Sequence, residues 1–214
     1  MSDAASTSNR KLWIYGASSH GLVIGESAIA AGWQVMGFLD DHASPGSTHM
    51  ALRVEKPGSI KPSADSQLII AIGDNATRQQ IQSQMITAGW AMANIIHPQA
   101  WVSPSATLGQ GIYVGPMAVI NSQANVEDGV IVNSASVVEH HAQLEAFCHI
   151  CPRAAMAGHV RIGSLTLLGT GAAVRPRISI GRRCIIGAGA AVVCDIPDDT
   201  TATGVPARVV QRVI

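Results

Sequence analysis

The sequence predicts a small α/β domain followed by a parallel β-helix. Its 214 residues combine 47% hydrophobic with only 4% aromatic side chains and include 21 glycines. The core must therefore be built from aliphatic side chains and closely approaching backbones. Short apolar strands alternate with helical segments over residues 11–96, and from residue 102 an aliphatic side chain recurs at every sixth position. The first pattern is typical of a parallel α/β sheet and the second of a solenoid.

Composition and charge exclude several classes of protein. Charged residues make up only 13% of the chain, and 14 basic residues balance 14 acidic ones. This balance argues against a disordered chain and against binding to nucleic acid or an anionic membrane surface. The polar start of the chain resembles no signal peptide, and no apolar run is long enough to span a membrane. We therefore expect a cytoplasmic protein with a disordered tail over residues 1–10.

The first domain is expected to occupy residues 11–96. A strand over 11–15 is followed by Gly-Ala-Ser-Ser-His-Gly at 16–21, a helix up to Gly32, and a second strand from Trp33 to Leu39. Strand, glycine turn and helix open a Rossmann-like nucleotide-binding unit, and acidic residues at the end of the second strand are where a nucleoside is usually bound. The predicted nucleotide-sugar-binding residues are Gly16, Ser18, His20, Gly21, Asp40 and Asp41.

Two details limit this prediction. Ser18 stands where a dinucleotide fingerprint needs its middle glycine, which disfavours a hydride-transfer enzyme. Backbone amides at the helix start still form a seat for an anion, with His20 projecting from the loop. The alternative is a glycine turn that only reverses the chain and leaves His20 in solvent.

The rest of the first domain completes a parallel sheet of four or five strands. Residues 67–72 form a third strand before Gly73, a helix runs from a capping Asn75 to Ala88, and a last strand runs from Trp90 to Ile96.

The second domain, residues 97–214, carries the six-residue repeat and a C-terminal cap. The aliphatic positions are Val102, Leu108, Val114, Ile120, Val126, Val132, Val138, Leu144, Ile150, Met156, Ile162, Leu168, Val174, Ile180, Ile186 and Val192. Such a repeat predicts a triangular prism with one hexad on each face and three hexads in each coil. The fifth and first positions of successive hexads then face inward, and the sixth faces outward.

Sorting the outward residues by face separates one polar face from two apolar ones. The first face carries Thr107, Asn125, Gln143, Arg161 and Ser179; the second carries Tyr113, Ile131, His149, Leu167 and Ile185; the third carries Val119, Val137, Ala155, Ala173 and Ala191. Two apolar faces predict a buried subunit interface that closes as a homotrimer.

The candidate chemistry lies at one corner of the prism. His140 and His141 fall between the third and first faces, and eighteen residues later Gly158 stacks over His140 and His159 over His141. A histidine beside a position without a side chain offers a general base, and the Gly158 amide could face a reacting carbonyl oxygen. The alternative is that His140 is only a turn residue.

His149 is the one polar residue in the apolar second face apart from the Tyr113 hydroxyl. It lies half a coil from His140, so the two can meet only between neighbouring subunits. Its imidazole needs a hydrogen-bond partner, either a structural one across the subunit interface or a ligand.

Cys148, Cys151, Cys184 and Cys194 occupy packing or corner positions. Cys148 and Cys151 could be half of a zinc site or a redox pair, but no second Cys/His pair stands at ligand spacing. We expect no metal cofactor and a structural role for Cys151.

The sequence also resembles a family. Val-Asn-Ser-Ala-Ser-Val-Val-Glu-His-His at 132–141, Phe-Cys-His-Ile at 147–150 and Met-Ala-Gly-His-Val-Arg-Ile-Gly at 156–163 are similar to bacterial sugar O-/N-acyltransferases. These include UDP-4-amino-sugar N-acetyltransferases and sialic acid O-acetyltransferases. The likeness extends over 15–21, 38–41, 71–75, 95–98 and 204–208.

The resemblance implies a left-handed β-helix trimer that binds acetyl-CoA between subunits and a nucleotide-linked sugar on the N-terminal domain. It makes His140 the general base, His149 an acetyl-CoA contact, Gly158 an amide near the thioester oxygen and Asp40 a nucleoside contact. Gly204, Pro206 and Arg208 would close the β-helix, with Arg208 available to CoA phosphates or serving only as part of a cap.

The sequence departs from the family at His141, where an acidic residue usually follows the catalytic histidine. A carboxylate would orient the imidazole and stabilise its protonated form. We expect Glu139, Glu145 or a residue across the interface to take this role, or activity to be reduced.

These observations predict acetyl-CoA-dependent acetylation of an amino group on a UDP- or GDP-linked sugar in bacterial surface glycan biosynthesis. No covalent intermediate is expected, because no Ser or Cys is paired with a base. The alternatives are sugar or sialic acid O-acetylation and a non-catalytic nucleotide-sugar-binding scaffold. A γ-type carbonic anhydrase is a further rival, but its histidine pair at His-x-x-x-x-His is missing.

Overall fold

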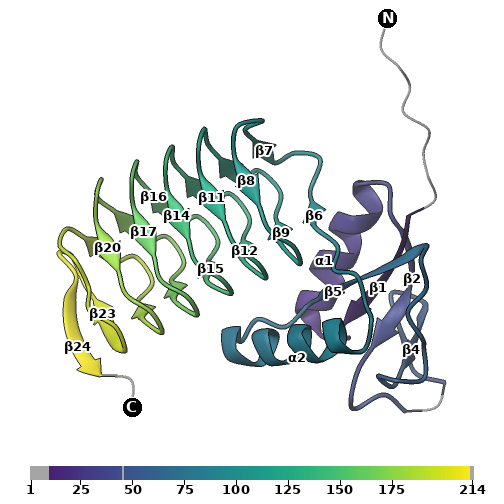
Figure 1. Cartoon of the computed structure of the whole chain (residues 1–214). Coiled ribbons are helices and arrows are strands. Elements are labelled where there is room, and N and C mark those ends of the chain that lie inside the picture. Colours follow the sequence, from purple (N-terminus) through teal and green to yellow (C-terminus); the bar gives the residue numbers. More distant parts are fainter. Residues whose placement is uncertain (1–9, 45, 213–214) are drawn as a thin grey trace, which may run out of the picture.

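The computed structural model describes residues 10–44 and 46–212, and the residues of the expected tail up to position 9 lie outside it. It confirms the predicted fold class of an α/β domain followed by a parallel β-helix (Figure 1). The β-helix extends to one side of the α/β domain, and α2 lies beside it.

The α/β domain is a five-stranded sheet with two helices. Its elements are β1 (Lys11–Tyr15), α1 (Ser19–Ala30), β2 (Gln34–Leu39), β3 (Thr48–His49), β4 (Leu52–Glu55), β5 (Ser66–Ile70) and α2 (Asn75–Thr87). The strand order is β3-β4-β2-β1-β5, and β1, β2, β4 and β5 pair in parallel. The carboxyl ends of β1, β2 and β5 therefore lie at one edge, where the glycine turn, Asp40 and Gly73 follow them.

Three expectations about this domain need correction. The short β3–β4 hairpin was not expected; β3 has only two residues, and the Leu52 and Val54 alternation in β4 is too short to stand out from the surrounding loop. The capping residue of α2 is Asp74 and not Asn75. The Asp74 carboxylate accepts a hydrogen bond from the Thr77 amide. The last predicted strand divides in two: Met92 forms a single parallel bridge with Leu68 of β5 in the α/β sheet, whereas β6 (Ile95–Ile96) pairs with β9 of the β-helix.

The repeat forms sixteen strands of two residues each, and every predicted aliphatic position is the second residue of one. The strands are β7 (Trp101–Val102), β8 (Thr107–Leu108), β9 (Tyr113–Val114), β10 (Val119–Ile120), β11 (Asn125–Val126), β12 (Ile131–Val132), β13 (Val137–Val138), β14 (Gln143–Leu144), β15 (His149–Ile150), β16 (Ala155–Met156), β17 (Arg161–Ile162), β18 (Leu167–Leu168), β19 (Ala173–Val174), β20 (Ser179–Ile180), β21 (Ile185–Ile186) and β22 (Ala191–Val192). Each pairs in parallel with the strand eighteen residues away, as Val137 does with Ala155. The three sheets are the faces of the predicted prism.

The corners explain how so tight a repeat is possible. The fourth residue of many hexads has a left-handed backbone, including His141 at φ 59° and His159 at φ 61°. Such a conformation is uncommon for residues other than glycine, and it is held here by backbone hydrogen bonds from one coil to the next. The His159 amide donates to the His140 carbonyl at 3.0 Å, for example.

Part of the second face of the prism, at Tyr113 and Ile131, is covered by the chain's own α/β domain, which corrects the expectation that the whole face forms a subunit interface, whereas Ile185 on the same face is 45% exposed. Tyr113 and Ile131 are 1% exposed and belong to the same core as the residues of β1 and α1. The Tyr113 hydroxyl lies 3.0 Å from the Ser27 hydroxyl of α1. The sequence pattern was correct in marking a buried face, but it could not tell an intramolecular partner from a second subunit.

Arg78 of α2 joins the two domains. Its guanidinium is buried and donates to the carbonyls of Gly129 and Phe147 in the β-helix, both at 2.8 Å, and to the Asn75 side chain at 2.7 Å. Burial lowers the pKa of Arg78 to about 10. These bonds satisfy a charge that would otherwise be costly to bury.

The chain ends in a hairpin of β23 (Thr200–Thr203) and β24 (Arg208–Arg212). β23 continues the second sheet beside β21, and β24 runs antiparallel to it. Gly204 and Pro206 lie in the connecting turn, so the expected closure of the β-helix is observed. Within the described ranges, neither helix is long and apolar enough to cross a membrane.

Candidate active site

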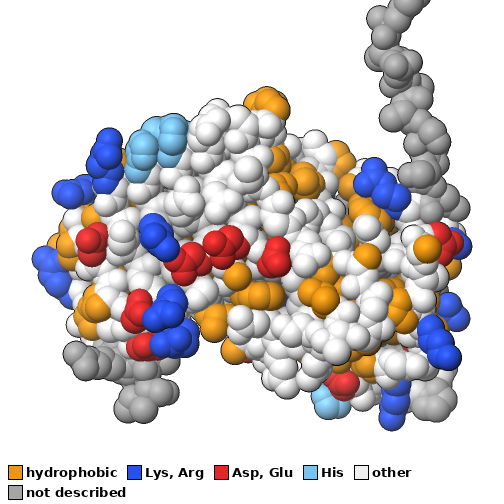
Figure 2. All heavy atoms as spheres, in the orientation of Figure 1, with side chains coloured by type: hydrophobic (Ala, Val, Ile, Leu, Met, Phe, Trp, Pro, Cys, Tyr) orange, Lys and Arg blue, Asp and Glu red, His pale blue; other side chains and the backbone are white. Residues whose placement is uncertain are grey.

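Three histidines meet at the corner between β13 and β14. The Nδ1 atoms of His140 and His141 are 3.1 Å apart, and the rings of His141 and His159 stack with centroids 4.6 Å apart. All three side chains are exposed, and Figure 2 shows histidines gathered at the upper edge of the β-helix beside basic side chains. Loss of water contact and the nearby Arg177 lower the pKa of His159, which favours its neutral form.

Gly158 provides the seat for the His140 ring, as its predicted stacking requires. A Cβ atom added at Gly158 would lie 2.6 Å from Nε2 of His140, closer than non-bonded atoms approach. Any side chain at this position would therefore displace the imidazole.

The backbone amide of Gly158 is left without a partner, and a comparison of corners shows why. At the next corner along each coil, Glu127 caps the amide of Ala146 one coil later at 2.9 Å, and Glu145 caps Ser164 at 3.1 Å. Glu139 is the equivalent of these carboxylates for Gly158. It accepts instead from the Asn121 side chain at 3.0 Å and from the His140 amide at 3.2 Å. Among the residues that the structure describes, none accepts from the Gly158 amide.

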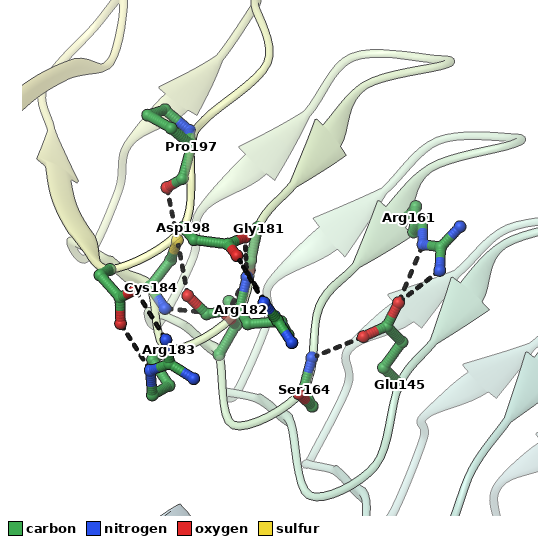
Figure 3. A network of polar contacts seen from close by, with 11 residues as sticks. Glu145, Arg161, Ser164, Gly181, Arg182, Arg183, Cys184, Pro197 and Asp198 are labelled. Carbon is green, nitrogen blue, oxygen red and sulfur yellow. Dashed lines mark hydrogen bonds and ion pairs between the residues drawn. The ribbon is translucent and has the colours of Figure 1, made fainter.

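The structure places neither expected carboxylate against the His140 ring. Glu139 contacts the His140 backbone and Asn121, as described above. Glu145 binds Arg161 and the Ser164 amide at a different corner (Figure 3). The ring partner of His140 within this chain is therefore His141.

The His140–His141 contact sets the tautomers of the two rings. If Nδ1 of His140 carries the proton and donates to Nδ1 of His141, then Nε2 of His140 is an unprotonated base. If His141 donates instead, neutral His140 holds its proton on Nε2 and cannot accept another there. The base-competent arrangement therefore requires neutral His141.

The predicted nucleotide-binding residues gather at the carboxyl edge of the sheet. The Asp40 carboxylate accepts from the backbone amides of Ala17 and His42, both at 2.9 Å, and so ties the glycine turn to the end of β2. Asp41 accepts from the Tyr15 hydroxyl at 2.8 Å. A cavity of about 370 Å³ opens here, lined by Ala17, Asp40, His42, Ala43, Ser47, Thr48, His49 and Val54.

The glycine turn itself is closely packed. Gly16 has φ +110°, and a Cβ atom on Gly21 would lie 2.1 Å from the Gly16 carbonyl oxygen. Both positions therefore need glycine, which brings the start of α1 against the loop. Ser18 is exposed beside them.

His20 of the α/β domain and His149 of the β-helix both lie where the two domains meet. His20 lies in the first turn of α1 and contacts the Tyr113 ring edge-on, so it neither projects from the loop, as expected, nor lies in solvent, as the alternative had it. Nε2 of His149 lies 3.1 Å from the Asn133 side-chain nitrogen, so its partner comes from within the chain and not from across a subunit interface or from a ligand. Nε2 of His20 and Nδ1 of His149 are buried without a described partner.

Burial keeps both imidazoles neutral. Loss of water together with the Arg78 charge lowers the pKa of His20 to about 4 and that of His149 to about 3. The two neutral rings are therefore part of the packed contact between the α/β domain and the β-helix.

The fold keeps the two candidate regions of one chain apart. The His140 corner joins the third and first faces, whereas His149 lies on the second face against the α/β domain. Arg208 lies in the C-terminal hairpin and donates to the Ala207 carbonyl at 2.9 Å. Burial raises the pKa of the Cys151 thiol to about 11, which fits the structural role expected of it.

The sequence did not point to two residues that shape this region, and it suggested a different role for a third. Arg78 and Asn133 resemble ordinary polar residues in a helix and a corner, and only the packing of the two domains reveals them. Glu139 was considered as a partner of the His140 ring, whereas its contact with Asn121 is what leaves the Gly158 amide free. The eighteen-residue period does align Glu139 with Asn121, so this signal was available.

The chain is similar to known proteins over nearly its whole length. Residues 11–85 match the family model described as the PglD N-terminal domain. The acetyltransferase domain of PglB from Neisseria gonorrhoeae is 40% identical, with a TM-score of 0.89 over 94% of this chain and 100% of that one.

Two further solved structures contain ligands. The PglB domain in complex with acetyl coenzyme A is 39% identical, with a TM-score of 0.87 over 94% and 100% of the two chains. PerB from Caulobacter crescentus, in complex with CoA and GDP-perosamine, is 36% identical, with a TM-score of 0.86 over 94% and 97%.

Proposed function

This chain belongs to the hexapeptide-repeat family of sugar N-acetyltransferases, and we propose that it transfers an acetyl group from acetyl-CoA to the amine of a nucleotide-linked amino sugar. The pathway would be bacterial surface glycan biosynthesis, and the location the cytoplasm, where acetyl-CoA is available. The observation that carries the proposal is the His140 imidazole resting on Gly158 beside an uncapped amide.

The reaction needs one base and one hydrogen-bond donor. Nε2 of His140 takes a proton from the sugar amine as its nitrogen attacks the thioester carbonyl. The Gly158 amide donates to the oxyanion of the tetrahedral intermediate. The intermediate then collapses, the carbon–sulfur bond breaks, and the proton held by His140 passes to the CoA thiolate. No Cys or Ser residue is acylated.

His141 serves as a positioning residue in this scheme. Its neutral Nδ1 accepts from His140 and so leaves Nε2 of His140 free to act as the base. A second imidazole can select this tautomer, but it adds no negative charge to stabilise protonated His140.

The acceptor would bind at the carboxyl edge of the α/β sheet. The Asp40 cavity and the glycine turn, whose Ala17 amide the Asp40 carboxylate holds, support this position. Because the His140 corner lies away from that edge, the amine would reach His140 of a neighbouring subunit. The proposal therefore includes a homotrimer with acetyl-CoA and His149 at the shared site.

The test is a panel of UDP- and GDP-linked amino sugars incubated with acetyl-CoA and followed by mass spectrometry. We expect one acetylated product and an equal amount of free CoA. Each amino sugar is paired with its hydroxyl counterpart, so that N- and O-acetylation are distinguished. A panel in which no sugar is acetylated, while binding is retained, would favour the scaffold alternative.

A further inference from the structure

The three-histidine corner has a property that acetyl transfer does not use. His140, His141 and His159 each offer one ring nitrogen, and these atoms all lie within 4.8 Å of one another. We propose that this cluster binds a divalent transition-metal ion that prefers imidazole ligands, such as Zn²⁺, Ni²⁺ or Cu²⁺, and that the bound ion blocks the His140 base.

The backbone holds the three side chains in place. The His141 amide donates to the Ser122 carbonyl and the His159 amide to the His140 carbonyl, both at 3.0 Å. Their Cα atoms are therefore fixed by the repeat, whereas the exposed rings can rotate onto an ion. Because the backbone is already fixed, metal binding costs only the conformational freedom of the three rings.

The donor set selects the class of metal. Imidazole nitrogen suits Zn²⁺, Ni²⁺ and Cu²⁺, whereas Mg²⁺ and Ca²⁺ need several oxygen ligands. The nearest carboxylate in the sequence, Glu139, is held by Asn121 and the His140 amide. Three imidazoles leave the ion an open position for water.

The eighteen-residue period predicts that His159 stacks over His141, but it does not by itself indicate a metal site, because these ligands do not follow the His-x-x-x-x-His spacing. His141 and His159 meet because one coil takes eighteen residues. The ion would not be a cofactor, so the expectation of a metal-independent reaction still stands. Only the inhibitory consequence rests on the proposed function.

The test measures metal binding without substrates, using the full chain freed of any affinity tag. Titration calorimetry with ZnCl₂ should give one ion per chain for the wild type. Co²⁺ in place of Zn²⁺ should give the visible absorption of a low-coordinate cobalt site. Replacing His159→Gln should weaken Zn²⁺ binding by about tenfold or more, since even outer-shell partners of a metal ligand contribute that much.

His42→Gln is the matched control, because His42 is exposed and lies outside the cluster. Its affinity for Zn²⁺ should equal that of the wild type. Equal weakening in both variants, or unchanged binding in His159→Gln, would overturn the proposal. Unaltered thermal melting of His159→Gln shows that loss of binding is not loss of fold.

The inhibitory consequence is tested by the ratio of acetyltransferase activity with and without Zn²⁺ in each protein. The ratio should fall for the wild type and for His42→Gln, return after chelation, and stay closer to one for His159→Gln. Stoichiometric binding with an unchanged wild-type ratio would reject inhibition. An inactive protein that still binds one Zn²⁺ would count against the proposed function and leave the metal site intact.

Discussion

His141 shows how much chemistry depends on a single corner residue. Its left-handed backbone places its ring against His140 and over His159 at once. Asn and Asp are among the few residues that adopt this backbone readily. The position can therefore be exchanged for a carboxylate without disturbing the repeat.

We expect His141→Asp to maintain or increase kcat. A carboxylate accepts from Nδ1 of His140, fixes the same tautomer and stabilises the protonated base. Because it holds protonated His140, the acidic limb of the pH–rate profile should move to higher pH than in the wild type.

His141→Asn is the matched control, since it has the same shape and no charge. It should leave the acidic limb unmoved. A fall in kcat of about tenfold or more in His141→Asp, equivalent to about 1.4 kcal/mol, would show that His141 has a role of its own.

Gly158→Ala should lower kcat by about 10²-fold, because displacement of a catalytic group by about 1 Å can cost that much. The new methyl group would occupy the space of the His140 ring. Acetyl-CoA binding and thermal stability should change little, since the displaced side chain is exposed. Steady-state kinetics and calorimetry measure these quantities.

A double-mutant cycle with His140→Ala separates this effect from general damage. His140→Ala alone should lower kcat by about 10²–10⁴-fold. If Gly158 acts by seating His140, the double variant should be no slower than His140→Ala. Additive losses would instead show that the new methyl group impairs catalysis by a route other than the His140 ring.

At the scale of elements, α1, α2 and the β-helix meet over neutral histidines, and this makes their contact sensitive to acid. The pKa values of about 4 for His20 and about 3 for His149 lie below the usual value of 6.5. The unfolded chain therefore binds more protons than the folded chain below about pH 6.5, and stability falls as the pH drops.

We expect the free energy of unfolding to decrease by about 1–3 kcal/mol for each of the two groups between about pH 7 and pH 4. Urea denaturation at several pH values measures this. His149→Gln removes one group, keeps a donor and an acceptor, and should flatten the profile. His42→Gln, which alters an exposed histidine, should not. A wild-type profile that is flat over this range would contradict the assignment.

The sequence predicted most elements, because each depends on local pattern. β1 matches the prediction residue for residue, and the β-helix strands follow from the six-residue period alone. β6 shows the limit of such reasoning, since Ile95 and Ile96 are apolar whichever sheet they join. Only the tertiary contact with β9 decides between the two.

The site was predicted to the same extent and for the same reason. The stacking of Gly158 over His140 follows from counting eighteen residues along the chain. The burial of His20 against Tyr113 does not, because it depends on how α1 meets the second face. Contacts within the repeat were predictable, whereas contacts between domains were not.

For the whole molecule, the predicted homotrimer now depends on the third face of the prism. Val119, Val137, Ala155 and Ala191 are half-buried and Ala173 is exposed, so this apolar surface has no intramolecular cover of the kind that shields part of the second face. Ile131, by contrast, lies in the core between the two domains. A charge there would disrupt the fold and would not test assembly.

We expect the wild type to be a trimer by light scattering and Val137→Arg to be monomeric or aggregated, because an unpaired charge would be buried in the interface. Thr107→Arg, on the polar first face, is the matched control and should remain trimeric. A monomeric wild type at micromolar concentration, or a trimeric Val137→Arg, would remove the third face from consideration.

The uninterrupted period of the β-helix has a consequence for how such a chain can change over time. Within the β-helix, each coil pairs only with the coils before and after it. His140 and His149 lie in its middle coils, and the Asp40 cavity lies in the α/β domain. Insertion of a single residue would exchange inner and outer side chains in everything that follows. Duplication of a whole coil between β20 and the final hairpin would preserve every column of stacked residues. Descendants of this protein can therefore lengthen in steps of one coil while the histidine corner stays unaltered.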